Sequence, residues 1–161
     1  MDIKEFYLKH KKAIHQGTLE VLGAIPEDQI TWRPAPGMLS LGEVARHIWM
    51  SEEGVRRVAF DDNWGYFEKR VPLGLSGILG EVKSLGGELA KLKAVHEETL
   101  SAVAAYPLER WEEERRNDAF NVRRKVVVML YGITDHEIHH RAQVGAYLHL
   151  LTGRRVSPYV L

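Results

Sequence analysis

Four stretches of this sequence repeat apolar residues with the period of an α-helix, and this pattern constrains the fold more than any other feature. They cover approximately residues 2–22, 40–60, 77–105 and 122–151. Each places its apolar side chains three and four residues apart, so that they line one face of a helix. No stretch alternates apolar and polar residues convincingly, as a half-buried strand does. The sequence therefore predicts an all-α protein.

The segments between these stretches predict how the helices are connected. Pro26 and residues 33–37 (RPAPG) break the first connection, residues 61–76 form a long second one, and Pro107 ends the third stretch. The charged residues 109–116 are expected to form a solvated loop. Because these connections are long rather than tight turns, a four-helix bundle with at least one crossover is as well supported as a simple up-down-up-down arrangement.

Local signals refine two of the predicted helices. Ser40 and Glu43 have the spacing of a capping box, in which each side chain binds a free backbone N–H of the first turn. Gly86 and Gly87 fall in the middle of the third stretch, where each glycine costs about 1 kcal/mol relative to alanine. We therefore expect a well-defined start for the second helix and a third helix that is not straight.

The composition narrows the class of protein. A chain of 161 residues is expected to form one domain, residues 1–161. It contains no cysteine, which excludes a disulfide framework, a thiolate zinc site and a cysteine nucleophile. The 22 basic and 22 acidic side chains balance, whereas a nucleic-acid-binding protein is expected to carry a basic excess. No apolar run reaches the roughly 20 residues that span a bilayer. These features predict a cytoplasmic protein that binds neither membranes nor nucleic acids.

Two histidines in the fourth stretch have the spacing of a metal site. His136 and His140 lie one helical turn apart, on the same side as the apolar residues Ile133 and Val144. Two imidazoles in this arrangement can both bring a ring nitrogen within the ~2.0–2.1 Å that a metal–nitrogen bond requires. His139 and His149 point elsewhere on the helical wheel and are expected on the surface.

The second stretch supplies a third candidate ligand, His47. It lies beside Val44 and Ile48 on the predicted buried face. A buried imidazole without a partner costs a few kcal/mol, so something must satisfy it. A hydrogen bond within the core would do so for any one histidine, but a shared metal ion would satisfy all three at once. The sequence therefore predicts that His47, His136 and His140 hold one divalent metal ion.

Residues 136–140 (HEIHH) also match the H-E-x-x-H pattern of zinc proteases, in which the glutamate is a general base. The extended form of that pattern requires glycine and histidine where this chain has Gln143 and Ala146, and no Asp or Glu follows Glu137 to serve as a downstream ligand. A protease is therefore not expected. Glu137 stays a candidate catalytic residue, with three roles left open: a base, a partner of a metal ligand, or half of an ion pair with an arginine.

Two further histidines and several aromatic residues are weaker candidates. His10 and His96 fall on the predicted apolar faces of the first and third helices, where each is a fourth ligand, a pocket acid–base group or a hydrogen-bonded core residue. Trp49 points away from the buried face of its helix, which suggests a surface for a partner such as a second copy of the chain. The connections 61–76 and 107–121 are expected to cover the pocket, with three aromatic residues as apolar walls: Trp64, Tyr66 and Phe67.

Several segments together resemble the DinB/YfiT-like family. Residues 39–48 (LSLGEVARHI), preceded by 31–34 (TWRP), are similar to the start of the second helix in that family. Residues 136–143 (HEIHHRAQ) resemble its C-terminal signature, in which glycine often stands in place of Ala142, and residues 151–153 (LTG) fit the end of its last helix. The resemblance covers essentially the whole chain in length and helix order.

This resemblance implies a four-helix bundle of up-down-down-up type, usually a homodimer, with a metal held by the residues matching His47, His136 and His140. Members of the wider family include transferases that use a low-molecular-weight thiol such as bacillithiol or mycothiol, and a thiol-dependent isomerase. Many other members have no assigned activity.

The reaction and the metal stay open at the level of the sequence. Three neutral imidazoles leave a divalent ion its full charge and open coordination positions, so it can activate water for hydrolysis or a small thiol for transfer. Imidazoles suit zinc, nickel, iron or copper alike, and manganese is a further candidate. The expected activity is therefore that of a metal-dependent transferase or hydrolase acting on a small molecule. The alternative is a non-catalytic metal-binding or stress-related structural bundle.

Overall fold

Four long helices form the body of the protein in the computed structural model, which describes residues 2–157. They are α1 (Ile3–Gly23), α2 (Leu41–Asp61), α5 (Leu85–Ala105) and α6 (Val126–Thr152). Both α1 and α2 pack against α5 and α6, which places α1 and α2 on opposite corners of a four-helix bundle. The predicted helical bundle is thus confirmed for the body of the protein.

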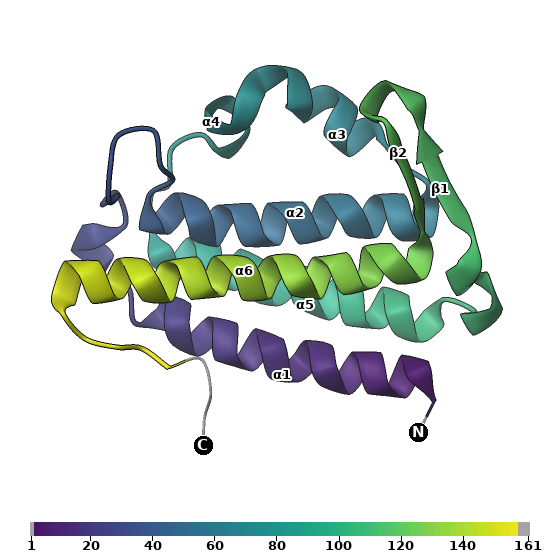
Figure 1. The fold of residues 1–161 in the computed structure, drawn as a ribbon, viewed down its shortest axis with the longest axis horizontal. Helices are drawn as coiled ribbons and strands as arrows, with labels where there is room; N and C mark the ends of the chain where they lie inside the picture. Colours follow the sequence, from purple (N-terminus) through teal and green to yellow (C-terminus); the bar gives the residue numbers. More distant parts are fainter. Residues whose placement is uncertain (1, 158–161) are drawn as a thin grey trace.

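The directions of the helices follow the up-down-down-up order. In Figure 1, α1 and α6 run one way along the bundle, and α2 and α5 run the other way. Because α2 and α5 are parallel neighbours, the chain must return along the whole length of the bundle between them. That return is the predicted crossover.

The crossover contains helices of its own and lies over α2 as a roof (Figure 1). It consists of α3 (Gly65–Arg70), a short 3₁₀ turn (Val71–Leu73) and α4 (Gly74–Leu79). Gly54 of α2 makes room for it, because a Cβ atom there would lie 2.7 Å from the ring of Phe67 and 2.8 Å from that of Tyr66. The roof therefore packs directly onto the backbone of α2.

The prediction of one long helix over residues 77–105 was wrong at its start. The chain leaves α4 at Gly80, whose φ of +59° suits a residue without a side chain, and α5 begins only at Leu85. The Ser84 side chain caps α5 by accepting a hydrogen bond from the Gly87 N–H at 3.1 Å. Gly86 and Gly87 therefore lie in the first turn of a helix, where they cost less than in its middle.

A short β-hairpin replaces the solvated loop expected at residues 109–116. Strand β1 (Glu114–Asn117) pairs antiparallel with β2 (Val122–Lys125), and the fourth helix begins at Val126 rather than at residue 122. The hairpin is held by Arg115, a buried side chain that donates hydrogen bonds to the carbonyl oxygens of Val58 and Ala59. This anchor depends on tertiary contacts, so the charged sequence alone did not indicate a strand.

The capping box at the start of α2 is present as predicted. The Ser40 hydroxyl accepts a hydrogen bond from the Glu43 N–H at 3.2 Å, and the Glu43 carboxylate accepts one from the Ser40 N–H at 2.6 Å. Trp49 on the same helix does not face solvent as expected. Its indole packs against the core and donates a hydrogen bond to Glu88 of α5 at 2.8 Å.

A buried polar layer crosses the middle of the bundle, between two apolar clusters of the core. One cluster contains Val21 and Ile48, and the other contains Tyr7 and Ile133. The layer between them receives side chains from all four long helices, and they are Lys11, His15, Glu52, His96 and Glu137.

Lys11 lies at the centre of this layer and is fully buried, with 0% of its surface exposed. Its ammonium group donates to the carboxylate of Glu52 at 2.7 Å and also to that of Glu137. Burial by itself would lower the pKa of Lys11, but the two carboxylates raise it, so the side chain stays charged. This ion cluster links α1, α2 and α6 at one level of the bundle.

Removing the lysine should destabilise the fold strongly. The variant Lys11→Met leaves two carboxylates buried near one another without their cation, and breaking a buried ion pair in this way costs about 3–5 kcal/mol. Urea unfolding followed by circular dichroism measures the change. Lys12→Met, at the exposed neighbouring position, is the matched control and should change stability by about 0.5 kcal/mol or less. Equal stability of the two variants would contradict a central role for this cluster.

Candidate metal centre

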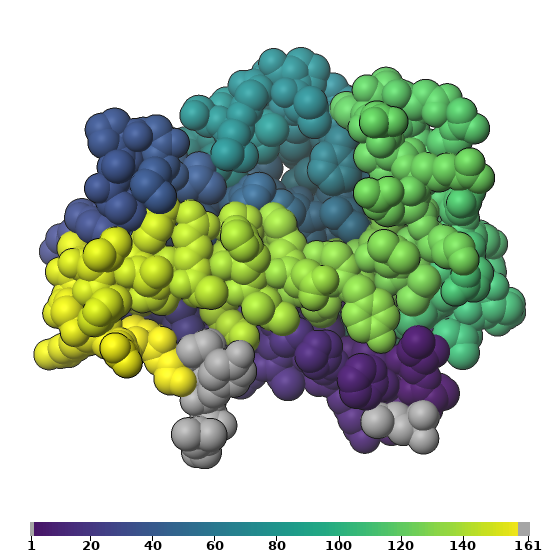
Figure 2. All heavy atoms as spheres, viewed as in Figure 1, coloured from purple at the N-terminus to yellow at the C-terminus, as the bar shows by residue number. Residues whose placement is uncertain are grey.

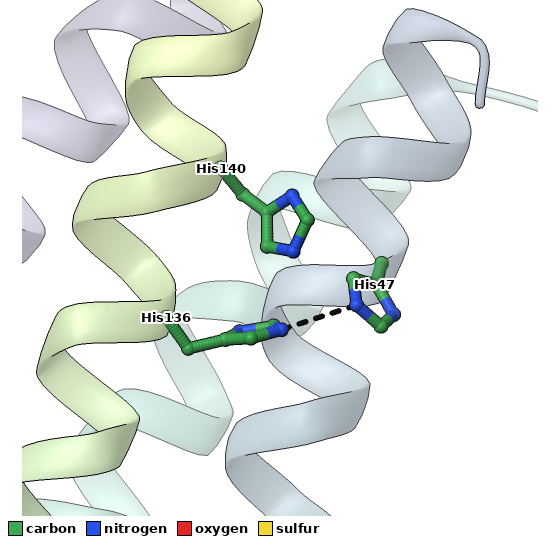
Figure 3. A group of neighbouring side chains, drawn as sticks. All are labelled: His47, His136 and His140. Carbon is green, nitrogen blue, oxygen red and sulfur yellow. Dashed lines mark hydrogen bonds between the residues drawn. The ribbon is translucent and has the colours of Figure 1, made fainter. Parts of the chain in front are cut away.

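Three histidine rings converge between α2 and α6 (Figure 3). His47 extends from α2, and His136 and His140 extend from successive turns of α6. The centroid of the His47 ring lies 4.8 Å from that of His136 and 4.7 Å from that of His140, and the last two centroids are 4.4 Å apart. One nitrogen from each ring can be chosen so that all three lie within 4.8 Å of one another. The three residues predicted from the sequence are therefore brought together.

Hydrogen bonds orient the imidazole of His140. Its Nδ1 lies 2.7 Å from the Oε1 atom of Gln143, whose amide nitrogen in turn donates to the Tyr147 hydroxyl at 2.8 Å. Since a carbonyl oxygen only accepts hydrogen bonds, the neutral His140 ring carries its proton on Nδ1. Its Nε2 then holds a lone pair directed away from Gln143. A partner of this kind is typical of a metal-binding histidine.

The other two rings meet through their Nε2 atoms, which lie 3.1 Å apart (Figure 3). The other nitrogen of the His47 ring, Nδ1, lies 3.5 Å from the Ser51 hydroxyl oxygen. In the absence of a cation, one of the two Nε2 atoms must carry a proton to form a hydrogen bond with the other. A divalent cation satisfies both lone pairs and that of His140 together. The donor set therefore fits a three-imidazole metal site.

Burial keeps the three imidazoles in the neutral form that binds metals. Desolvation, together with the charge that a protonated neighbouring histidine would carry, lowers the pKa of His136 to about 3 and that of His47 to about 4. Burial also lowers the pKa of His140. A metal ion therefore does not have to displace protons from charged imidazolium groups at neutral pH.

A cavity of about 480 Å³ opens beside His136. Figure 2 shows the corresponding hollow between the crossover roof and α6. Its walls are mostly apolar and come from α2, the roof, the hairpin and α6; the lining residues are Ser51, Glu52, Val55, Phe67, Val122, Arg124, Val128, Met129, Gly132, Ile133 and His136. A second cavity, of about 90 Å³, lies beside His47 under the roof. Two of the three histidines therefore border a cavity, His136 the larger one and His47 the smaller one.

The aromatic residues of the crossover take different positions. Phe67 lines both cavities and Tyr66 lines the smaller one, in line with their expected role as walls. Trp64 instead stacks on Phe120 of the hairpin turn, with ring centroids 6.2 Å apart, and donates a hydrogen bond to Asp62. It connects the two segments that cover the site.

Comparison with known proteins adds the family. The sequence matches the DinB superfamily over residues 12–144, a range that contains all three histidines of the triad. The chain is a member of the DinB superfamily. The crystal structure of a DinB-like protein, YjoA, from Bacillus subtilis superposes with a TM-score of 0.74, covers 95% of each chain and is 21% identical in sequence. At that identity the likeness supports the DinB-like fold. No curated protein matches this sequence.

Glu137, the candidate catalytic residue, points away from the cavity in this DinB-superfamily chain. Its carboxylate binds Lys11 and lies 3.4 Å from the Nδ1 atom of His15, on the α1 side of α6. Burial alone would raise the pKa of Glu137, but the contacts with His15 and Lys11 outweigh it and lower the pKa to about 2. Glu137 therefore forms an ion pair, which was one of its three predicted roles. Its partner is a lysine and not the expected arginine.

The remaining histidines lie outside the triad. His10 is exposed and stacks on Phe6, with ring centroids 5.8 Å apart, because the face of α1 on which it lies is turned to solvent. His96 is buried and stacks on His15 at 3.7 Å, within the polar layer. His139 and His149 are exposed as predicted. Among residues 2–157, neither His10 nor His96 belongs to the group that could share a metal ion.

Glu52 is a functional candidate that the sequence reasoning missed. It lines the large cavity together with His136. A signal was available, because Glu52 follows Ile48 by four residues and so falls on the predicted apolar face of its helix. A carboxylate in such a position is either paired or placed for a function.

His96 should make the stability of the protein depend on pH. Burial and the charges of His15 and Lys11 lower its pKa from 6.5 to about 3. Between these values the unfolded chain binds a proton that the folded chain does not, so stability falls as the pH falls through this window. His96→Phe should lose less stability on acidification than the wild type, by up to about 1.4 kcal/mol per pH unit. Thermal melts in chelator across this range measure the difference.

His149→Phe is the control for that experiment, because His149 is exposed. Its stability profile should run parallel to that of the wild type. A parallel profile for His96→Phe as well would show that His96 does not titrate differently in the folded and unfolded states.

Proposed function

We propose that this protein is a divalent-metal-dependent enzyme that acts on a small molecule in the cavity beside the three histidines. The observation that carries this proposal is the convergence of three neutral imidazoles, one of which, that of His136, lines an apolar cavity. A metal site that served only to stabilise the bundle would be expected to close its coordination sphere with protein ligands. Three ligands next to an open space are instead typical of a catalytic site.

An ion held here would lower the pKa of a water molecule or thiol toward neutrality and so supply a nucleophile. The chain provides the surroundings for such a step. Gln143 and Tyr147 orient His140, and the apolar side chains of Val55, Phe67 and Ile133 line the cavity beside the triad. Because the chain contains no cysteine, a thiol would have to come from a separate low-molecular-weight cofactor. Thiol transfer is favoured by the family resemblance, and hydrolysis is the other reaction.

The alternative function is a metal-binding or stress-related structural bundle without turnover. It would use the same three histidines, so metal binding does not distinguish the enzyme from the structural bundle. The cavity supports the enzyme, since a purely structural role gives no reason for an apolar hollow next to one of the ligands. Screening thiol transfer and ester or amide hydrolysis, with metal-stripped protein as the control, tests for turnover. Activity that depends on added metal would support the enzyme, and inactivity of fully loaded protein in every assay would favour the structural role.

Metal binding should require the triad. After chelator treatment and dialysis against zinc, nickel, ferrous iron or manganese, the wild type should bind about one ion per chain, measured by elemental analysis. His136→Ala should lose this ion, because two imidazoles cannot replace three. His139→Ala, on the exposed side of the same helix, should retain it. A wild type that binds none of these metals would overturn the proposal.

Gln143 should tune the affinity of the site. Gln143→Leu removes the hydrogen bond that holds His140 with its Nε2 lone pair free, and loss of such a partner lowers metal affinity about 10–100-fold. Competition with a chromophoric chelator measures the dissociation constant. Gln16→Leu, an exposed substitution on α1, is the control. Unchanged affinity in Gln143→Leu would mean that His140 is oriented by packing alone.

The homodimer implied by the family resemblance stays a prediction. Light scattering of the purified protein would give its mass in solution. Within residues 2–157, the structure has no helix that is long and apolar enough to cross a membrane.

A further inference from the structure

A buried carboxylate forms part of the cavity wall beside the triad. Glu52 follows His47 on α2 by little more than one helical turn, and it lines the same cavity as His136 of α6. Only 3% of its surface is exposed. A carboxylate is expensive to bury, so its position beside an otherwise apolar space calls for a reason.

The two oxygen atoms of Glu52 have different surroundings. Oε2 accepts a hydrogen bond from the Lys11 ammonium at 2.7 Å. Oε1 is buried and has no hydrogen-bond partner among the described residues. A buried acceptor left without a partner costs about 1–3 kcal/mol, more if it is charged. The structure therefore holds the carboxylate through Oε2 and leaves the hydrogen-bonding capacity of Oε1 unused.

Comparison with Glu137 shows that pairing with Lys11 does not by itself explain this arrangement. Both carboxylates bind the same ammonium group, from α2 and α6 respectively. The Oε1 atom of Glu137 also lacks a hydrogen bond, but it lies 3.4 Å from the Nδ1 atom of His15 on the α1 side, whereas Glu52 lies on the cavity wall. The other polar groups of that wall are Ser51, the triad residue His136 and the exposed Arg124 on the hairpin. Among the lining residues, Glu52 is the one carboxylate and thus the strongest proton acceptor available beside the triad.

We propose that Glu52 is the proton acceptor of this site and that Lys11 is its positioning residue. The inference rests on the proposed function. In the step it assigns, the O–H or S–H bond of the nucleophile breaks and its proton passes to Oε1 of Glu52. The electron pair of that bond stays on oxygen or sulfur and forms the new bond to the electrophilic substrate, whose bond to the leaving group breaks and leaves its electron pair on that group. The proton returns later to the leaving group or to solvent, so Glu52 is regenerated.

Lys11 contributes in two ways. Its hydrogen bond to Oε2 fixes the orientation of the Glu52 carboxylate. Its positive charge compensates the negative charge of that buried group. Glu137 also accepts a hydrogen bond from Lys11 and so helps to keep the ammonium group in place. The contacts from Glu137 through Lys11 to Glu52 thereby hold the Glu52 carboxylate at the cavity wall.

Cobalt(II)-loaded protein provides a test that does not depend on a known substrate. The visible absorption of the ion changes with pH when its exchangeable ligand ionises, and a nearby carboxylate opposes that ionisation. In Glu52→Gln the pH midpoint of this change should therefore fall by about one unit relative to the wild type. Glu53→Gln is the matched control, because Glu53 is the next residue on α2 and pairs with Arg57 instead. Its midpoint should equal that of the wild type.

The possible results separate the two proposals. If the wild type binds no cobalt, the proposed function fails and this inference falls with it. If Glu52→Gln binds cobalt as the wild type does and its midpoint is unchanged, Glu52 is only a structural partner of Lys11, and the inference alone is overturned. Once a substrate is found, Glu52→Gln should lower kcat by about 10²–10⁴-fold at unchanged metal content, the range for loss of a general base.

A second variant tests the inference if Glu52→Gln does not fold. Glu52→Asp keeps the charge that Lys11 requires and withdraws the carboxylate from the cavity by one methylene group. It should lower the cobalt midpoint in the same direction as Glu52→Gln, by a smaller amount. Circular dichroism confirms folding of both variants, and a midpoint in Glu52→Asp equal to that of the wild type would overturn the inference.

Discussion

The antiparallel contact between α2 and α6 is the constraint on which the rest of the structure depends. It brings His47 to the two histidines of α6 on its outer side, and on its inner side it places Glu52 and Glu137 on the same lysine of α1. A shift of α2 along α6 by one turn, about 5.4 Å, would separate both groups. The capping box at Ser40 and the close approach of the roof at Gly54 fix where α2 begins and how it is covered.

The polar layer and the triad can be understood as two consequences of this contact. Buried ion clusters add little net stability compared with apolar packing, but breaking one is costly, and they can therefore define the register of the helices around them. Here the ion cluster lies between two apolar parts of the core, at the level where the cavity opens. The histidine triad is thereby built on the long helices, while the covering segments provide part of the cavity walls. Such a division suits a site whose ligands must stay within a fraction of an ångström of one geometry.

Segments that cover the site were the least predictable part of the fold. The hairpin depends on Arg115 reaching the backbone of α2, and the division between α4 and α5 depends on Gly80 and the cap at Ser84. These are short segments with weak periodicity, so tertiary contacts outweigh their local preferences. The same limit applies to Glu137, since helical periodicity placed it on a buried face without showing which neighbour it would meet.

Spacing within single helices was enough to predict the four long helices, the capping box and the inward direction of His47, His136 and His140, because these follow from a period of 3.6 residues. Membership of the DinB superfamily was also visible in the sequence. The distances among the three rings, the pairing of Lys11 with two glutamates and the cavity that Glu52 reaches were decided by the tertiary structure alone. Each depends on the relative height and rotation of two or more helices, and these quantities are set by how side chains pack between helices far apart in the sequence.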